Sequence, residues 1–204
     1  MKILNFSHLK SLVIFSLLIF SSCAKKETVI EPPPPESPKY IVPLAKDNNW
    51  TFIRTYYDTV GLVISLDTLN YKIISDTLIH NQQWFKNSYL SSFYRTDSVG
   101  LWHYDDYAKL LYKYPAKVGE EYLQDYRWRV SVISTDTLIN TPMGVLSCYQ
   151  YQLDYEGFKI NDFLAPGFGF VKMESAGQWF APYPRLTAPF LYMKLEMISA
   201  SITK

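Results

Sequence analysis

Apolar and polar residues alternate with a period of two along most of the chain from Tyr40 onward, which is the pattern of half-buried β-strands. The alternation is clearest in residues 50–57, 128–132, 149–155 and 191–198. Further strand candidates are residues 63–75, 83–88, 92–96, 101–104, 110–114 and 168–175. Roughly ten or more short strands separated by turn residues predict an all-β, single antiparallel domain with little helix. A curled sheet, a sandwich and an open barrel all fit this pattern.

The first residues follow a different pattern. Lys2 and Lys10 form a basic start, residues 12–20 are almost wholly apolar, and Ser21 and Ser22 precede Cys23. An apolar run of this length is too short to span a bilayer, which takes roughly 20 residues, so residues 1–22 are interpreted as an export signal. The small-small-Cys ending resembles the lipobox of bacterial lipoproteins, with Phe20 where Leu is usual. This resemblance implies that Cys23 is diacylated and becomes the mature N-terminus.

Residues 23–39 are predicted to be a lipidated cysteine followed by a stalk. Four consecutive prolines and Pro38 fix φ and remove backbone donors, so neither helix nor sheet is available to this segment. An extended polyproline-like conformation would rise about 3 Å per residue and hold the domain of residues 40–204 away from the membrane. A proline-rich recognition ligand is the alternative, and the position beside Cys23 favours the spacer.

Charge and cysteine content exclude several classes of protein. The chain has a net charge of +1, and loss of Lys2 and Lys10 with the signal takes it to −1, so nothing indicates a partner made of nucleic acid. With Cys23 acylated, Cys148 has no partner for an intrachain disulfide. Without a disulfide, the stability of the exported domain is expected to come from its core.

Aromatic residues make up 17% of the chain, and 17 of them are tyrosines. Such residues suit pleated, half-buried strands, so the first interpretation is packing across the sheet. A platform that binds a glycan or a lipid is the functional alternative.

A weak internal repeat links residues 72–81 with residues 131–140, where KIISDTLIHN recurs as SVISTDTLIN. It predicts two similar hairpins in one sheet, each with a turn built on Ser, Asp and Thr side chains, including Asp76 and Asp136. Chance similarity is the alternative.

Catalytic and metal-binding motifs are not found in the sequence. His103 lies beside Asp105 and Asp106, which a metal or acid–base site would require to converge, but a hairpin tip with Asp as a turn residue is favoured. Cys148 is interpreted as a small apolar strand residue rather than a nucleophile. No pair of acids is singled out for glycoside hydrolysis. The sequence therefore indicates no catalytic residue, no metal site and no cofactor.

The segment 176–189 is the best candidate for ligand binding. It connects two predicted strands and carries Trp179, Phe180, Tyr183 and Arg185 among three prolines, which would restrict its conformations. Such a segment could stack on a sugar ring or a partner surface. The alternative is a loop that covers an open end of the sheet.

Three further patterns, in residues 110–119, 141–149 and 165–174, contain a Pro-x-Gly turn and an Ala-Pro-Gly-x-Gly turn. Together they resemble a group of uncharacterised all-β lipoproteins of Bacteroidota, over most of residues 48–200. The resemblance implies fold and localisation and brings no catalytic residues. In these turns Gly144, Gly167 and Gly169 are expected to adopt backbone angles that other residues resist.

The sequence thus predicts a lipid-anchored protein of the cell envelope with a non-catalytic binding or scaffolding β domain. Ala24 gives no acidic retention signal, which favours the outer membrane by analogy and leaves the periplasmic and exterior faces open. The expected ligand is hydrophobic or a glycan, the membrane is a partner through the N-terminal lipid, and an envelope protein is a further candidate partner. The alternative function is an envelope hydrolase that uses a pair of carboxylates.

Overall fold

The computed structural model describes residues 37–89, 92–155, 158–176 and 191–203. Twelve strands make up its regular secondary structure, so the predicted all-β class is confirmed. No helix in these ranges is long and apolar enough to cross a membrane. The strands are β1 (Asn49–Tyr57), β2 (Val63–Ile79), β3 (Gln82–Asn87), β4 (Phe93–Thr96), β5 (Gly100–Tyr104), β6 (Ala108–Lys113), β7 (Glu121–Leu123), β8 (Arg129–Thr141), β9 (Gly144–Tyr155), β10 (Phe158–Ala165), β11 (Gly169–Ala176) and β12 (Leu191–Ser201).

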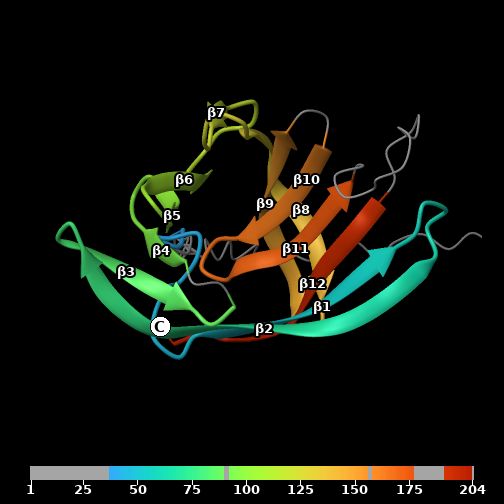
Figure 1. The fold of residues 1–204 in the computed structure, drawn as a ribbon, viewed down its shortest axis with the longest axis horizontal. Helices are drawn as coiled ribbons and strands as arrows, with labels where there is room; N and C mark the ends of the chain where they lie inside the picture. The colour runs from blue at the N-terminus through green and yellow to red at the C-terminus, as the bar shows by residue number, and fades with distance from the viewer. Residues whose placement is uncertain (1–36, 90–91, 156–157, 177–190, 204) are drawn as a thin grey trace, which may run out of the picture. The chain divides into compact units, whose positions relative to one another are not determined.

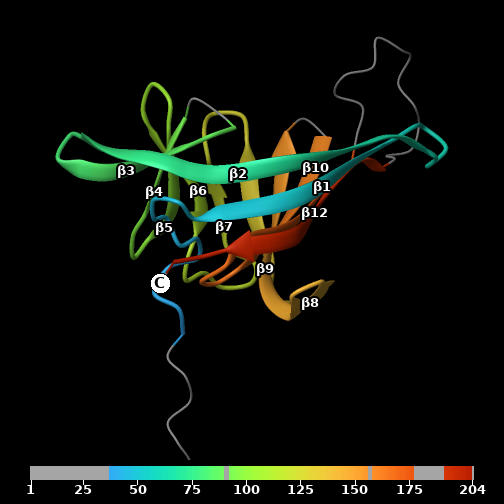
Figure 2. The ribbon, with the colours of Figure 1, turned by 90° about the horizontal axis from the view of Figure 1, so that it is seen from below.

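All twelve strands form one antiparallel sheet in the order β6-β5-β4-β3-β2-β1-β12-β11-β10-β9-β8-β7. Strands consecutive in the sequence are neighbours except β6 and β7. The first and last strands pair with each other, while β6 and β7 are left as the two edges. The sheet curls so that β3–β6 lie opposite β9–β11, with β1 and β2 running beneath both groups (Figures 1 and 2). It is therefore a strongly curled sheet that is not closed into a barrel.

Tyrosine hydroxyls span the seam between the two edges. The hydroxyl of Tyr122, on β7, accepts from the backbone N–H of Lys113 at 3.1 Å and donates to the carbonyl of Leu111 at 2.9 Å. Tyr151, on β9, donates to the carbonyl of Lys113 at 2.7 Å. These bonds satisfy polar groups on the β6 edge that would otherwise need a pairing strand or water. Side-chain hydrogen bonds thus link the β6 edge to β7 and β9, although β6 and β7 do not pair as strands.

The core lies on the concave face of the curl, and the predicted alternation explains its composition. On β8, Val130 and Val132 are fully buried while Arg129 is exposed, as the period of two requires. Trp50 and Phe52 occupy the same face of β1. Residues from both ends of the sheet belong to one buried cluster, so the two edges pack on a shared core.

The sequence repeat falls in two hairpins of the same sheet, as predicted, but the expected turns built on Ser, Asp and Thr side chains are wrong. Residues 72–79 belong to β2 and residues 131–140 to β8, and both strands continue through the Ser-Asp-Thr segment. Each strand instead shifts register there, between Ile73 and Ser75 in β2 and after Val132 in β8. A bulge adds a residue without ending the strand. Ser, Asp and Thr, which are typical of turns, can therefore lie within a strand.

Two strands were not among the predicted candidates, namely β7 and β10, and β2 is longer than expected. The predicted glycine angles are confirmed, because φ is +115° at Gly144, +77° at Gly167 and +91° at Gly169. At Gly167 a Cβ atom would also lie 3.1 Å from Pro38, so close approach adds to the backbone requirement.

A candidate apolar binding site

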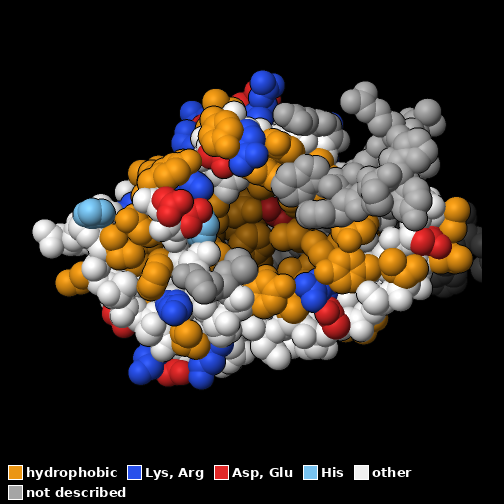
Figure 3. Space-filling model, viewed as in Figure 1, with side chains coloured by type: hydrophobic (Ala, Val, Ile, Leu, Met, Phe, Trp, Pro, Cys, Tyr) orange, Lys and Arg blue, Asp and Glu red, His pale blue; other side chains and the backbone are white. Residues whose placement is uncertain are grey.

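The concave face of the sheet holds an apolar cavity of about 210 Å³. It opens on the face shown in Figure 3, where hydrophobic side chains surround a central hollow. Its walls come from both halves of the sheet, together with Val42 and Leu44 from the segment before β1. The remaining lining residues are Trp50, Phe52, Tyr71, Ile73, Asn87, Tyr94, Leu101, Leu111, Phe170, Met173 and Leu195.

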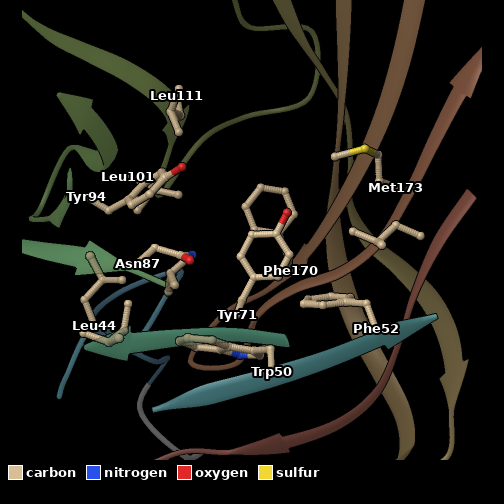
Figure 4. A pocket seen from close by; sticks show the side chains of 13 residues that line it. Leu44, Trp50, Phe52, Tyr71, Asn87, Tyr94, Leu101, Leu111, Phe170 and Met173 are labelled. Carbon is tan, nitrogen blue, oxygen red and sulfur yellow. The ribbon is translucent and has the colours of Figure 1, made fainter. Parts of the chain in front are cut away.

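Aromatic side chains shape this cavity, which we name the concave cavity. Tyr71 and Phe170 stand between the side formed by Leu101 and Leu111 and the side formed by Met173 (Figure 4). The ring of Tyr71 packs edge-on against Phe52 at 5.4 Å between centroids. Edge-to-face pairs of this kind restrain both rings, so these walls are set before any ligand arrives.

The indole of Trp50 forms part of the wall and is fixed from outside the cavity. Its Nε1 donates a hydrogen bond of 2.6 Å to the carbonyl of Phe168, in the turn before β11. A Cβ atom at Gly169 would lie within 3.7 Å of this indole nitrogen and 3.2 Å from Val42. The Ala-Pro-Gly-x-Gly turn therefore positions one wall of the cavity.

The polar groups in the lining are few and uncharged. They are the hydroxyls of Tyr71 and Tyr94 and the amide of Asn87, and none of the described lining residues is charged. Burial raises the pKa of Tyr94 to about 12 and raises that of Tyr71 as well, so both phenols stay neutral at physiological pH. Neither hydroxyl bonds to another residue in the described part of the chain. The site can thus offer two hydroxyls within an otherwise apolar surface.

A buried acid lies next to the concave cavity. Asp162 on β10 is directly opposite Met173 on β11, so both side chains lie on the concave face. The Tyr112 hydroxyl donates to Oδ2 of Asp162, and the Tyr112 ring packs against Phe170 at 5.4 Å. Burial raises the pKa of Asp162 to about 7, against the opposing effect of the Tyr112 hydrogen bond. Asp162 Oδ1 is enclosed, so this acid supports the wall rather than facing a ligand.

A second hollow, of about 520 Å³, lies where the two ends of the described domain meet. Pro38, Pro43 and Thr203 are among its lining residues. The concave cavity is the better candidate because aromatic and aliphatic side chains from both halves of the sheet line it.

The cluster around His103 forms the predicted hairpin. Asp105 and Asp106 lie in the turn between β5 and β6, and Asp105 forms an ion pair with Lys109 at 3.0 Å. His103 is half-buried against the ring of Tyr94, and burial lowers its pKa. No group of three or more His, Cys, Asp or Glu side chains within the described ranges could hold a metal ion.

Cys148 is fully buried on β9 and has no disulfide. Burial raises the pKa of its thiol to about 12, so the thiolate needed for nucleophilic attack is disfavoured. Cys148 pairs with Thr137 beside a register shift in β8, and its side chain is buried. The interpretation as a small apolar residue fits this environment.

Trp179, Phe180, Tyr183 and Arg185, the predicted ligand-binding residues, lie outside the described residues, as does Cys23. The strands on either side are as predicted, since β11 ends at Ala176 and β12 begins at Leu191. Their proposed roles remain predictions from the sequence.

The concave cavity was not found residue by residue from the sequence. The signal was present in the inward positions of adjacent strands, such as Trp50 and Phe52 on β1 and Tyr71 and Ile73 on β2. Which of these inward residues meet across a hollow depends on the curl of the sheet, and alternation within one strand does not contain that information.

No protein-family model matches the chain, and no curated protein matches it significantly. Two solved structures are similar to it. One is a candidate lipoprotein from Parabacteroides distasonis, 11% identical, with 81% of this chain and 100% of that chain covered and a TM-score of 0.38. The other is a candidate exported protein with a YmcC-like fold from Bacteroides fragilis, 13% identical, with the same coverage and TM-score. At this TM-score neither likeness supports an argument about this chain.

Proposed function

We propose that this protein is a lipid-anchored component of the cell envelope whose β domain binds a hydrophobic ligand without catalysis. The observation that supports ligand binding is the concave cavity of about 210 Å³, lined by apolar side chains from both halves of the sheet. The anchor is supported by the signal-like residues 1–22, Cys23 and the proline-rich segment behind it.

The size of the cavity limits what it encloses. An apolar cavity of about 150 Å³ stays dry and accepts benzene, whereas sites for drug-sized ligands usually measure about 300–1,000 Å³. At about 210 Å³ the concave cavity would enclose a small apolar molecule or one apolar end of a longer one. The rest of a longer ligand would extend through the open side seen in Figure 3.

The uncharged lining further restricts the ligand. Burying an unpaired charge is costly, and none of the described lining residues offers a counter-charge. A charged group of the ligand would have to stay at the mouth of the cavity. A hydroxyl or carbonyl group could enter and bond to the hydroxyl of Tyr71 or Tyr94.

A hydrophobic ligand is favoured over a glycan by the position of the described aromatic residues. Trp50 and Trp84 are almost fully buried, and many of the tyrosine rings pack against other rings inside the sheet. A glycan platform needs exposed faces of aromatic rings. The residues predicted for that role, Trp179, Phe180, Tyr183 and Arg185, lie outside the described residues.

Ligand binding is tested by filling the cavity. Leu111→Trp places a bulky indole ring in the concave cavity, and Leu123→Trp makes the same exchange at an exposed position of β7. We expect the uncharged dye N-phenyl-1-naphthylamine to bind wild type and Leu123→Trp equally and Leu111→Trp at least tenfold more weakly. Equal dye binding by all three proteins would contradict ligand binding in this cavity.

The anchor is tested separately. Cys23→Ser removes the acceptor of the lipid, so the variant should fail to incorporate a labelled fatty acid in its host, while wild type incorporates it. Equal labelling of the two proteins would contradict lipidation at Cys23. The absence of an acidic residue at Ala24 supports an outer-membrane location, which separation of inner and outer membranes would test.

A further inference from the structure

The hairpin that joins β1 and β2 ends in exposed apolar side chains. Five of the seven residues from 60 to 66 are large and apolar, and all five are between 59% and 78% exposed. They are Val60, Leu62, Val63, Ile64 and Leu66. The hairpin projects from the sheet at one end of the molecule (Figures 1 and 2), where orange side chains gather in Figure 3. We name these five residues the apolar tip.

The apolar tip comprises the turn and the first residues of β2. Val60 and Leu62 lie in the turn, Val63 pairs with Tyr57 on β1, and Ile64 is the extra residue of a bulge before the pair of Ser65 with Tyr56. All four apolar side chains are exposed. Removing all of them from water takes a medium that encloses the end of the hairpin.

We propose that the apolar tip inserts into the surface of a lipid bilayer. Amphipathic segments enter the boundary between headgroups and acyl chains by about 5–10 Å, which suits a short tip rather than a spanning strand. Tyr56 and Tyr57 lie directly behind the tip, and Tyr192 packs on Tyr56 at 5.7 Å between ring centroids. Tyrosine is enriched at this depth because its ring is apolar and its hydroxyl stays in water.

The backbone of the turn is prepared for an environment poor in water. The carboxylate of Asp58 accepts from the N–H groups of Val60 at 3.0 Å and Leu62 at 2.8 Å. The N–H of Asp58 donates to the carbonyl of Leu62 at 2.9 Å. Unsatisfied N–H groups are costly away from water, so these bonds lower the cost of insertion. The charge of Asp58 keeps the insertion shallow.

Attraction to anionic lipid is not required. Arg54, the cation on β1, forms two bonds with Asp67, of 2.9 Å from Nε and 2.5 Å from a terminal nitrogen. Asp58 adds a second negative charge, so residues 54–67 carry no excess of positive charge. Binding should therefore depend on apolar contact and be insensitive to salt.

The proposal needs neither the lipid at Cys23 nor a ligand in the concave cavity.

The test uses the mature chain, residues 23–204, with Cys23→Ser so that no lipid is attached. Flotation with phosphatidylcholine vesicles measures its partition coefficient. Leu62→Ser with Ile64→Ser removes two tip side chains, and Leu78→Ser with Leu138→Ser removes two side chains of matched exposure, 72% and 69%, from other hairpins. We expect the tip variant to partition at least tenfold more weakly, the control to match wild type within twofold, and 1 M NaCl to have no effect.

Four results would overturn the proposal. The first is a wild-type chain that does not float with the vesicles, and the second is a tip variant that floats as well as the control. The third is a clear fall in Tm for the tip variant alone, which would mean that residues such as 177–190 already cover the tip. The fourth is a wild-type dimer that the tip variant abolishes, although five side chains are few beside the roughly 20 residues a side of a stable interface.

Discussion

The hydroxyl of Tyr112 donates a hydrogen bond to Asp162 and thereby joins the edge strand β6 to β10 across the concave face of the sheet. Both side chains are fully buried, and Asp162 Oδ1 has no hydrogen-bond partner among the described residues. A buried carboxyl with one unsatisfied oxygen favours the neutral acid, in line with a pKa of about 7. The contact beside the concave cavity is thus sensitive to protonation near neutral pH.

Replacing Asp162 should change how stability depends on pH. The folded-state pKa of about 7 lies above the unfolded value of 3.8, so the folded state binds the extra proton between these values. The contribution of Asp162 is full below about pH 4 and is lost as the pH rises through about 7. At 1.36 kcal/mol per pKa unit the loss is about 4 kcal/mol at most. Urea denaturation from pH 4 to 8 should show a fall in wild type that Asp162→Asn removes.

Tyr112→Phe provides the matched check on this assignment. The Tyr112 hydrogen bond lowers the pKa of Asp162, so its removal should move the midpoint of the fall to higher pH. The carboxyl ¹³C shift of Asp162, followed by NMR, measures that midpoint directly. A carboxyl that titrates near pH 4 in wild type would contradict the buried neutral acid.

The hydroxyl of Tyr122 should stabilise the open seam. In Tyr122→Phe the N–H of Lys113 and the carbonyl of Leu111 lose their partner, and leaving such groups unpaired costs about 1–3 kcal/mol. Urea denaturation measures the difference. Tyr126→Phe removes a hydroxyl from a tyrosine that is largely exposed and should change the free energy of unfolding by less than about 0.5 kcal/mol. Equal effects of the two changes would mean that the seam bonds contribute nothing.

Gly100 is required at the start of β5. Its φ is +151°, and a Cβ atom there would lie 2.0 Å from the carbonyl oxygen of Tyr112 on the neighbouring strand. Gly100→Ala should therefore separate β5 from β6 and cost more than about 3 kcal/mol. At Gly61, with φ +86°, a Cβ atom meets nothing within 4 Å, so Gly61→Ala should cost about 1 kcal/mol from backbone strain alone. Thermal unfolding of both variants checks the order, and a Gly100→Ala protein as stable as Gly61→Ala would contradict the close approach.

Sequence patterns were sufficient to predict strands whose two faces differ. Trp50–Tyr57 and Leu191–Ile198 were both predicted within a few residues of the observed strands. The strand β10 was missed because Asp162 occupies an inward position that an apolar residue would normally fill. The residue that interrupts the apolar pattern of β10 is also the buried acid next to the concave cavity.

The bulges and the concave cavity could not be predicted from the residue pattern of one strand taken alone. Ser75, Asp76 and Thr77 are typical turn residues, yet pairing with β3 keeps them in a strand, because a neighbouring strand can override local preference. The concave cavity similarly depends on which strands face each other after the sheet curls. Leu111 and Met173 line one cavity although they are far apart in sequence and belong to different halves of the sheet.

Ligand binding in the concave cavity is the central claim, and native mass spectrometry of the protein purified from its own host tests it most directly. Wild type should carry an additional apolar molecule, which organic extraction releases, and Leu111→Trp prepared in parallel should lack it. Leu123→Trp, altered on the exposed surface, should retain it. Wild-type protein with only its own mass, or the same bound molecule in all three proteins, would contradict the claim.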